Sequence, residues 1–449
     1  MNVRKLALDT LCKCESAAQY ANLALDSGIK KFNITGDDRS LFTVLVYGTI
    51  EHKLTLDYYI DQLSSLPTEK IDAETRNILR LGLYQMIYTR TADHAAVNET
   101  VSLAPMRSRG FVNAILRAYI RKKDTLTLPS KETDLYRALS VTYSFPEATC
   151  QKLCESFGAD EAERLMEAMC LPPPLTLRVN TLRISLNEFL ERLEKIGVSA
   201  KRTDHAPFGV RLNDSVSYSK LDSELHGLFF VQDEASQLAS AALDAQKGDK
   251  VIDVCSCPGS KSFSAALHME NEGSIYAYDI SKSKLPLIAS GAERLGISII
   301  TSALQDGRLP VEEHVGRADR VICDVPCSGF GVVAKKPDIR YKDISEAAPL
   351  PNIQYDIICN AARYLKVGGT MIYSTCTVLP EENYGVIKRF LDSHGNDFEL
   401  TPINIGDFSV PEGYVTLFPH LHGTDGFFIC KLTRKEVLPP SEGNGKKHD

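Results

Sequence analysis

The sequence contains no tryptophan, no run of about 18 apolar residues and no Cys-x-x-Cys pair. Without a long apolar run, we expect no membrane-spanning helix. The first residues, from Met1 to Lys5, do not lead into the apolar core of a secretion signal, so we expect a cytoplasmic protein. Without Cys-x-x-Cys pairs a zinc ribbon is disfavoured, and we expect no metal. Any base that stacks on this protein must do so on Phe, Tyr or Arg.

Two nucleotide-binding patterns are also missing. The sequence has neither the GxGxxG turn of nicotinamide-dependent enzymes nor the GxxxxGK[ST] loop that holds nucleoside triphosphates. Its twelve cysteines do not predict a disulfide framework in a chain that we expect in the cytoplasm, and most should be buried packing residues. The length of 449 residues suggests two or three domains.

The formal net charge is −7, but the charge is unevenly distributed. Residues 1–150 hold 19 Lys and Arg against 17 Asp and Glu, a balance of +2, and the remainder holds 32 against 41, a balance of −9. Within 101–137 the tally is 8 basic against 3 acidic residues. Any surface that binds nucleic acid is therefore expected in that segment.

Residues 1–170 are predicted to be helical, because apolar residues recur every three or four positions without strand-like alternation. Gly82 lies on the apolar face of the helix expected at 75–88 and would let another helix come close. In the helix expected at 109–123, basic residues recur at helical spacing, namely Arg109, Arg117 and Arg121, followed by Lys122. This stripe is either an ordinary solvated helix face or a surface that contacts nucleic-acid phosphates.

The N-terminal segments resemble the NusB-type RNA-binding helical domain. The segments that carry the resemblance, in order and spacing, are 38–48, 79–85, 97–99 and 110–117. The resemblance implies an all-α NusB-like domain, expected over residues 1–140, that binds RNA or ribosomal partners. Arg109, Arg117, Arg121 and Lys122 are its candidate RNA-binding residues.

A proline run at 172–174 interrupts the helical pattern and marks a boundary or linker. Beyond it, 175–179 alternates as a strand. A helix is predicted between Ser185, as its N-terminal cap, and Gly197, beyond its end. We therefore expect a small α+β module of ferredoxin-like type over residues 141–230.

From Asp249 onward, short apolar runs alternate with helical stretches, which predicts a doubly wound α/β sheet. Strands are expected at 250–255, 274–278, 297–301, 319–324 and 369–374, with a late strand near 426–432. We expect this Rossmann-like domain to cover residues 231–435 and the tail, 436–449, to be disordered.

A tight turn joins the first of these strands to the following helix, whose free backbone N–H groups and partial positive charge can hold a ligand. The turn reads Cys255-Ser256-Cys257-Pro258-Gly259-Ser260-Lys261. Asp279 follows the next strand, 20 residues after Gly259, a spacing suited to a ribose hydroxyl. Asp306, after the third strand, would lie near an adenine. An adenosyl cofactor without a pyrophosphate fits this pattern, and we expect S-adenosyl-L-methionine.

Two cysteines follow two buried strands that we expect to be neighbours. Asp324 and Cys327 follow one strand, and Cys376 follows the other. Because the loops after parallel strands gather at one edge of a sheet, both thiols should reach one pocket, where we expect Lys261 or helix ends to favour their thiolates. The alternative is that both cysteines only fill the core.

This trio suits chemistry on a cytosine ring. A thiolate that adds to carbon 6 makes carbon 5 nucleophilic, and a carboxylic acid at ring N3 assists the addition. After carbon 5 takes a methyl group, a base must remove the carbon-5 proton before the enzyme is released. Asp324, Cys327 and Cys376 supply these groups.

The same segments resemble the RNA 5-methylcytosine methyltransferases of the RsmB/NOP2/Sun family, and the whole chain except its tail is similar to the RsmB type. The segments that carry the resemblance are 324–331, 337–340, 368–369, 373–377, 381–383 and 424–428. It implies an S-adenosylmethionine-dependent enzyme that methylates cytosine in 16S ribosomal RNA. It implies Cys376 as nucleophile and Cys327 as the group that assists proton removal and enzyme release. Implied cofactor contacts are residues 255–261, Asp279, Asp306 and Asp324.

One departure from that family lies in the cofactor turn, where Ser260 replaces the usual glycine. If this position needs a positive φ, serine costs roughly 1 kcal/mol, and cofactor binding is weakened. Two alternatives stay open: a 5-methylcytosine methyltransferase acting on transfer RNA, and a non-catalytic RNA-binding assembly factor, which Ser260 alone favours. We expect a monomer whose partner is small-subunit ribosomal RNA.

Overall fold

The structure, a computed structural model, describes residues 2–17, 20–213, 216 and 218–436. The chain divides into two compact units, one formed by 1–172 and 332–345 and the other by 173–331 and 346–449. Almost all of the expected disordered tail lies outside the described residues. No helix within the described part is both long and apolar enough to cross a membrane. The boundaries expected near 140 and 230 stay predictions.

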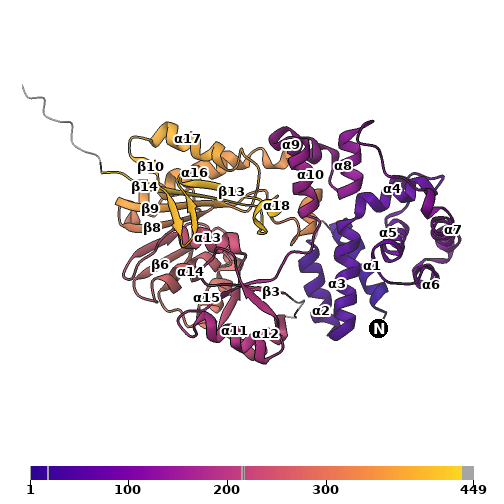
Figure 1. Ribbon diagram of the computed structural model, residues 1–449, viewed down its shortest axis with the longest axis horizontal. Coiled ribbons are helices and arrows are strands. Elements are labelled where there is room, and N and C mark those ends of the chain that lie inside the picture. Colours follow the sequence, from indigo (N-terminus) through magenta and orange to yellow (C-terminus); the bar gives the residue numbers. More distant parts are fainter. Residues whose placement is uncertain (1, 18–19, 214–215, 217, 437–449) are drawn as a thin grey trace, which may run out of the picture. The chain divides into compact units, whose positions relative to one another are not determined.

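The first unit is built from helices, as the periodicity of its apolar residues predicts (Figure 1). Its 3₁₀ helices are η1 (Thr68–Lys70), η2 (Lys123–Thr125) and η5 (Pro337–Tyr341). Its α-helices are α1 (Val3–Ala17), α2 (Ala21–Phe32), α3 (Gly36–Glu51), α4 (Lys53–Leu63), α5 (Ala73–Tyr88), α6 (Asp93–Leu103), α7 (Met106–Lys122), α8 (Leu135–Tyr143), α9 (Glu147–Phe157) and α10 (Ala159–Ala168).

Helix α5 lies in the core of this unit. Ile78, Leu79 and Leu83 are fully buried. A Cβ atom on Gly82 would lie 2.9 Å from Thr100 Cγ2 in α6 and 3.0 Å from Leu116 Cδ2 in α7. The close approach expected at Gly82 is confirmed, because only a residue without a side chain leaves room for both neighbouring helices.

Residues 332–345 follow the Cys327 loop in sequence but pack in the helical unit. Arg340 on η5 is 1% exposed, and its guanidinium donates to the carbonyl oxygens of Glu51 (2.6 Å), Tyr143 (3.2 Å) and Met169 (3.2 Å). The guanidinium also lies over the Phe145 ring, 4.6 Å from its centroid. The motif at 337–340 therefore serves to anchor this segment among helix ends, because a buried guanidinium must find acceptors.

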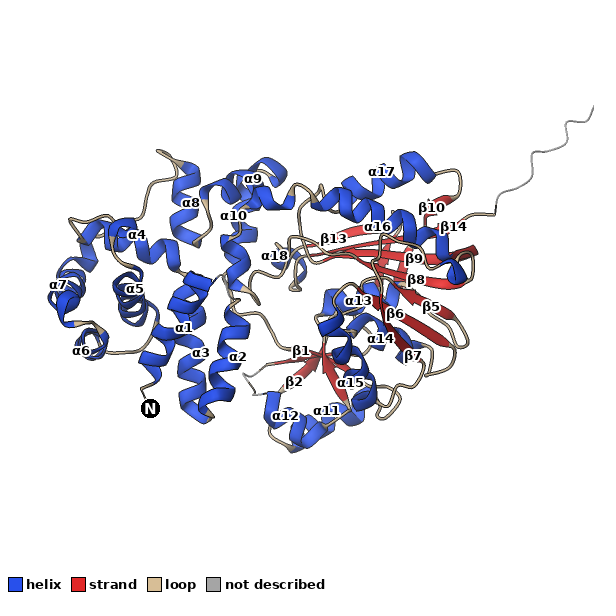
Figure 2. Ribbon diagram, turned by 180° about the vertical axis from the view of Figure 1, so that it is seen from behind, coloured by secondary structure: helices blue, strands red, loops and turns tan. Residues whose placement is uncertain are grey.

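The second unit begins with the expected α+β module. Its elements are β1 (Thr176–Val179), α11 (Leu186–Lys195), β2 (Ala200–Arg202), β3 (Gly209–Leu212), α12 (Tyr218–Leu225) and β4 (Phe229–Val231). The strand order β2-β3-β1-β4, with all pairs antiparallel, is that of a ferredoxin-like sheet, and Figure 2 shows both helices beside it. Ser185 caps α11 in a capping box with Glu188, and Gly197 follows the helix with φ 71°, both as expected.

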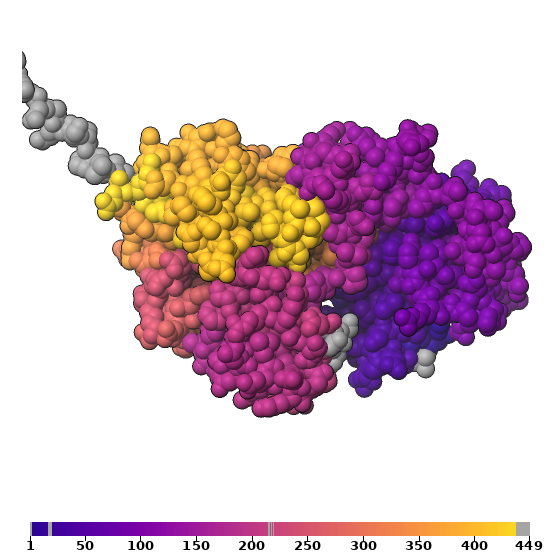
Figure 3. Space-filling model, viewed as in Figure 1, coloured from indigo at the N-terminus to yellow at the C-terminus, as the bar shows by residue number. Residues whose placement is uncertain are grey.

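The module contacts the C-terminal part of the same unit. Arg211 Nη2 donates to Gly423 O (3.3 Å), and the ring of His205 lies 5.5 Å from that of Phe408. Figure 3 shows this boundary on the surface, where magenta meets yellow.

The rest of the second unit is a Rossmann-like mixed sheet with the order β10-β14-β9-β8-β5-β6-β7, extended by β13 on β14. Strands β5 to β9 are parallel, whereas β14 runs antiparallel to β9. The strands are β5 (Lys250–Asp253), β6 (Ser274–Asp279), β7 (Ile300–Leu304), β8 (Ala318–Asp324), β9 (Leu365–Thr375), β10 (Phe398–Leu400), β13 (Tyr414–Leu417) and β14 (Phe427–Arg434). A separate hairpin pairs β11 (Ile403–Ile405) with β12 (Phe408–Val410).

Helices cover both faces of this sheet, as Figure 2 shows. Ile322 and Ile372 pack on the side of α13, α14 and α15, whereas Val321 and Tyr373 pack on the side of α16 and α17. The helices of this unit are α13 (Glu234–Ala242), α14 (Ser260–His268), η3 (Lys282–Lys284), α15 (Leu285–Leu295), η4 (Glu312–His314), α16 (Leu350–Tyr364), α17 (Tyr384–His394) and α18 (Pro419–His422), and η6 (Ile344–Ala347) spans the boundary between the units at 345/346.

The strand expected at 297–301 begins three residues later than predicted. Gly296 ends α15 in the left-handed conformation, and Ile297 N donates back to Ala292 O (2.9 Å). Ile297 therefore closes the helix with an apolar contact instead of opening the strand.

Candidate active site

The two cysteines meet at the carboxyl ends of β8 and β9. These strands are parallel neighbours with Asp324 opposite Ser374, and the loops that follow them leave the sheet side by side. Cys327 Sγ lies 3.2 Å from Cys376 Sγ, and both residues are partly exposed. The expectation that the thiols reach one place is confirmed, because the register of the strands brings the two loops together.

Asp324 is held between two partners at the end of β8. Its Oδ2 accepts from Lys261 Nζ (2.7 Å), and its Oδ1 accepts from Ser374 Oγ (2.6 Å). The Lys261 side chain is 8% exposed and its Nζ lies 5.0 Å from the centroid of the Phe427 ring, whereas the Asp324 side chain is 31% exposed. The carboxylate therefore has a fixed orientation and an open side.

The expectation that Lys261 favours the thiolates is wrong for Cys327. The ammonium group of Lys261 is taken up by Asp324. The hydrogen bond with Cys376 and burial, together with the negative charges of Cys376, Glu382 and Asp324, raise the pKa of Cys327 well above its ordinary value. Cys327 therefore keeps its proton in the resting protein.

Glu382 anchors the loop that carries Cys327. It is 1% exposed, and its Oε2 accepts from the backbone N of Ser328 (2.9 Å) and from Gln354 Nε2 (2.8 Å). Ser328 Oγ also bonds Thr377 Oγ1 (2.9 Å) in the loop after β9. The two cysteine loops are thus tied to each other by buried hydrogen bonds. The position of Gln354, which comes from α16, gave no signal in the sequence.

Gly331 is required where the two loops cross. A Cβ atom here would lie 1.8 Å from Gly426 O and 2.9 Å from Cys376 O. Two backbone hydrogen bonds form in that space. Gly331 N donates to Cys376 O (3.0 Å), and Gly426 N donates to Gly331 O (2.8 Å). Any side chain at 331 would separate the Cys327 loop from the Cys376 loop.

The cofactor turn has the expected course from β5 to the first residue of α14. Gly259 carries the positive φ, 107°, and Ser260 opens the helix outside the left-handed region. The free-energy cost of a positive φ at Ser260 therefore does not arise, since the positive φ lies one residue earlier, at Gly259. This removes the one feature that favoured a non-catalytic assembly factor.

The acidic residues expected at the cofactor site converge around this turn. Asp279 Oδ2 accepts from Cys257 N (3.2 Å) and its Oδ1 from Ser281 N (2.8 Å). Asp306 is held by Arg308, with 2.6 Å between Oδ2 and Nη2. Burial and the surrounding carboxylates raise the pKa of Cys255 well above its ordinary value. Those carboxylates are Asp253, Asp324, Asp279 and Asp306. Such a cluster favours a cationic ligand and disfavours a pyrophosphate.

Asp253, at the end of β5, is a member of this cluster that the sequence did not single out. It is 1% exposed, and its carboxylate accepts from Ser262 Oγ (2.6 Å) and Cys255 N (3.3 Å). Burial raises the pKa of Asp253 to about 6. It thus ties the helix start of α14 to the strand end beneath the turn.

The raised pKa of Asp253 predicts a pH-dependent loss of stability. In the unfolded chain an Asp ionises near pH 3.9, whereas in the folded protein Asp253 keeps its proton up to about pH 6. The free energy of unfolding therefore falls as the pH rises from about 4 to 6. Relative to the unsubstituted protein, Asp253→Asn should gain up to about 3 kcal/mol in free energy of unfolding across that window. Chemical denaturation at several pH values measures the difference, with the exposed Asp407→Asn as control. If the difference in free energy of unfolding between the two proteins were the same at every pH, the raised pKa of Asp253 would be contradicted.

The candidate RNA-binding residues lie on one helix of the first unit. Arg109, Arg117, Arg121 and Lys122 are all on α7 and all exposed. Arg117 Nε donates to Asn113 Oδ1 (3.0 Å), and Arg109 Nη2 donates to Ala104 O (3.2 Å). The stripe is a solvated basic face, which agrees with both readings of the sequence. Its contact with RNA stays a prediction.

Comparison with known families finds three successive matches along the chain, of which the second begins within the helical unit that runs to residue 172. The description "NusB family" matches residues 1–121, and that of the ferredoxin-like domain of RsmF/B-like methyltransferases matches 145–219. The description "16S rRNA methyltransferase RsmB/F" matches 240–433. The expected NusB-like, ferredoxin-like and Rossmann-like parts are confirmed.

Individual proteins extend this similarity over the whole chain. The probable ribosomal RNA small subunit methyltransferase B of Bacillus subtilis (strain 168) is 36% identical over 97% of this chain and 99% of that protein. Ribosomal RNA small subunit methyltransferase B of Yersinia enterocolitica is 32% identical over 97% and 99%. The crystal structure of PH0851 shares the fold, with a TM-score of 0.80 and 24% identity over 97% of this chain and 99% of that chain. With relatives this similar over nearly its whole length, the chain belongs to the RsmB/F family of 16S rRNA methyltransferases.

Proposed function

We propose that this protein methylates carbon 5 of a cytosine in 16S ribosomal RNA, with S-adenosyl-L-methionine as methyl donor and a covalent cysteine–cytosine adduct as intermediate. The observation that carries the proposal is the pair of sulfur atoms, 3.2 Å apart, beside the fixed carboxylate of Asp324. A substrate carbon can meet one thiol while the other handles a proton.

Cys376 is the nucleophile in this proposal. When ionised, Cys376 can accept a hydrogen bond from the Cys327 thiol 3.2 Å away, which would stabilise the thiolate that adds to carbon 6 of the ring. Asp324 faces ring N3 and passes to it a proton taken from Lys261 Nζ, so that N3 gains an N–H bond as the thiolate adds to carbon 6 and Lys261 is left neutral. The negative charge that the sulfur transfers to the cytosine ring is thereby neutralised by the proton at N3.

Cys327 then assists removal of the carbon-5 proton and release of the enzyme. Its hydrogen bond with Cys376 is the largest cause of its raised pKa. Once Cys376 is bonded to carbon, that cause is gone, and Cys327 ionises more readily. Cys327 can therefore release its own proton to solvent and become available as the base only after the adduct has formed, when the carbon-5 proton must leave.

The residues around the cofactor turn fit S-adenosyl-L-methionine, which supplies an electrophilic methyl group on a sulfonium when bound. The acidic cluster around Cys255 suits its positive charges. Asp279, oriented by two backbone N–H groups, would hold the ribose hydroxyls, and Asp306 would lie towards the adenine. Gly259, with its positive φ, would let the backbone of residues 255–261 approach the ligand.

The helical unit would supply RNA affinity through the exposed basic residues of α7. Arg109, Arg117, Arg121 and Lys122 can neutralise phosphates without reading sequence, which suits positioning of a structured RNA. The target cytosine would be unstacked into the cysteine pocket.

The substrate is tested by bisulfite sequencing of ribosomal RNA from cells with and without the gene. We expect one cytosine of 16S RNA to lose its protection. Purified protein should restore 5-methylcytidine at that position when given S-adenosyl-L-methionine. A lost methyl group in transfer RNA instead, or no change in either RNA, would contradict the proposal.

The anchoring of the Cys327 loop by Glu382 leads to a prediction for turnover. Glu382→Ala removes the acceptor for Ser328 N, so Cys327 is no longer held against Cys376. We expect kcat to fall by about tenfold to a hundredfold, with cofactor affinity nearly unchanged. Glu382→Gln keeps an acceptor oxygen and should retain most activity, and Glu381→Ala at the exposed neighbour is the control. Equal activity of the Ala and unsubstituted proteins would show that the loop needs no anchor.

A further inference from the structure

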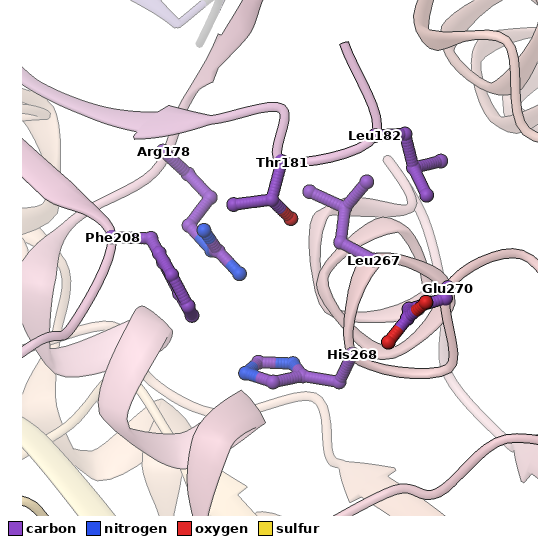
Figure 4. A pocket seen from close by; sticks show the side chains of 7 residues that line it. All are labelled: Arg178, Thr181, Leu182, Phe208, Leu267, His268 and Glu270. Carbon is purple, nitrogen blue, oxygen red and sulfur yellow. The ribbon is translucent and has the colours of Figure 1, made fainter. Parts of the chain in front are cut away.

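A cavity of about 460 Å³ lies in the second unit between the ferredoxin-like module and α14. Figure 4 shows Arg178, Thr181 and His268 pointing into one space, with Phe208 at one side. Its volume falls in the range of small-ligand sites. The cavity is lined by Arg178, Thr181, Leu182, Phe208, Leu267, His268 and Glu270, none of which belongs to the site described above.

Arg178 on β1 is a buried cation whose hydrogen bonding is incomplete. The residue is 2% exposed, its Nη1 donates to Val179 O (3.0 Å), and its guanidinium lies 4.5 Å from the centroid of the Phe208 ring. Within the described residues its Nη2 has no hydrogen-bond partner. Burial lowers the pKa of Arg178 to about 9. Since buried charges are ordinarily paired, the unpartnered Nη2 indicates an anion that the described residues do not supply.

The remaining polar groups of the cavity define what that anion must carry. Glu270 is engaged with Lys247, whose Nζ lies 2.6 Å from its Oε2. His268 Nδ1 lies 2.8 Å from Ser264 O, and because a carbonyl only accepts, Nδ1 holds the proton and Nε2 is an acceptor. Burial lowers the pKa of His268 to about 4, which keeps the ring neutral near pH 7. The cavity thus combines donors from Arg178 with an acceptor from His268.

We propose that this cavity binds a phosphate group that carries or adjoins a hydroxyl. The guanidinium fork matches phosphate oxygens, and a P–OH group or a ribose 2′-OH can donate to His268 Nε2. A carboxylate is ionised near pH 7 and offers acceptors only, so it leaves Nε2 unmatched. The phosphate comes either from an RNA backbone or from a free phosphate monoester. The site is separate from the cysteines and does not depend on the proposed methyl transfer.

Calorimetric titration of the full-length protein tests the proposal with three phosphate probes: inorganic phosphate, AMP and a short single-stranded RNA. Acetate at the same ionic strength is the comparison anion. We expect at least one phosphate probe to bind and acetate not to bind. Failure of all three probes, or equal binding of acetate, overturns the proposal.

Substitution of the buried arginine decides whether the bound phosphate lies in this cavity. Arg178→Met should weaken phosphate binding by about tenfold to a hundredfold, as expected for loss of a charged hydrogen bond. Arg202→Met, at an exposed arginine of the same module, should leave it unchanged. Unaltered phosphate binding by a folded Arg178→Met protein overturns the proposal.

If Arg178→Met does not fold, two other measurements test the proposal. Glu270→Gln, at an exposed residue of the cavity rim, should bind phosphate about threefold more tightly because it removes a repelling charge. In the unsubstituted protein, the ring ¹⁵N signals of His268 should shift when phosphate is added. No shift and no gain in affinity together overturn the proposal.

The same titrations identify the source of the phosphate. If Arg178→Met weakens RNA binding as much as AMP binding, the cavity holds a backbone phosphate of RNA. If it weakens only AMP or inorganic phosphate, the ligand is a free phosphate. Cofactor binding, measured in parallel with S-adenosyl-L-methionine, should not respond to either substitution, which separates a failure here from a failure of the proposed function.

Discussion

Cys376→Ala is expected to reduce methyl transfer by about 10⁴-fold or more, because in the proposed mechanism its sulfur forms the bond to carbon 6. Cys327, the neighbouring thiol, keeps its proton and is held by its own loop through Ser328 and Glu382. It therefore cannot take over the attack without moving. Transfer of radiolabelled methyl groups to 16S RNA measures the loss.

Cofactor binding provides the control for this substitution. Cys376 follows β9 whereas the cofactor turn at 255–261 follows β5, so the affinity for S-adenosyl-L-methionine should change by less than about twofold. Cys359→Ala, at a partly exposed cysteine on α16, should keep both activity and affinity. A Cys376→Ala protein that methylates at a near-native rate would reverse the assignment of the two cysteines.

Cys327→Ala is expected to trap a covalent complex between protein and RNA. Without this group the carbon-5 proton leaves slowly, and the bond from Cys376 to carbon 6 persists. Multiple-turnover methylation should fall at least about a hundredfold, the lower range for loss of an acid–base group. A denaturing gel should show a slower band that contains both protein and RNA.

The trapped complex should depend on both the nucleophile and the methyl donor. The double variant Cys327→Ala with Cys376→Ala should form no adduct, since the bond originates at Cys376. Omission of S-adenosyl-L-methionine should reduce the amount of adduct, because an unmethylated adduct can reverse. An adduct of equal yield in the double variant would place the covalent bond on another residue.

The local patterns of the chain were sufficient to find the elements that carry the site. Short apolar runs predicted β5, β6, β8 and β9 within a few residues, and a parallel sheet brings their loops to one edge. For this reason Asp324, Cys327 and Cys376 could be grouped before any coordinates were known. The cap at Ser185 and the close packing at Gly82 were also readable, because each depends on neighbours in sequence or on a missing side chain.

Partners that come from distant parts of the chain could not be read in this way. Lys261 bonds Asp324 across 63 positions, and Gln354 and Glu382 meet over the Cys327 loop. Residues 332–345 were expected in the catalytic domain but pack among helices. Ser260 looked unfavourable until the positive φ was found at Gly259.

The order of residues along the chain thus decided which groups stand at strand ends, since periodicity and turn signals act over a few positions. The tertiary structure alone decided which charge each group faces, which thiol keeps its proton and where Arg178 has a donor that no described residue matches. Hydrogen bonds and electrostatic interactions depend on distances through space, and those distances are set only when remote segments pack together.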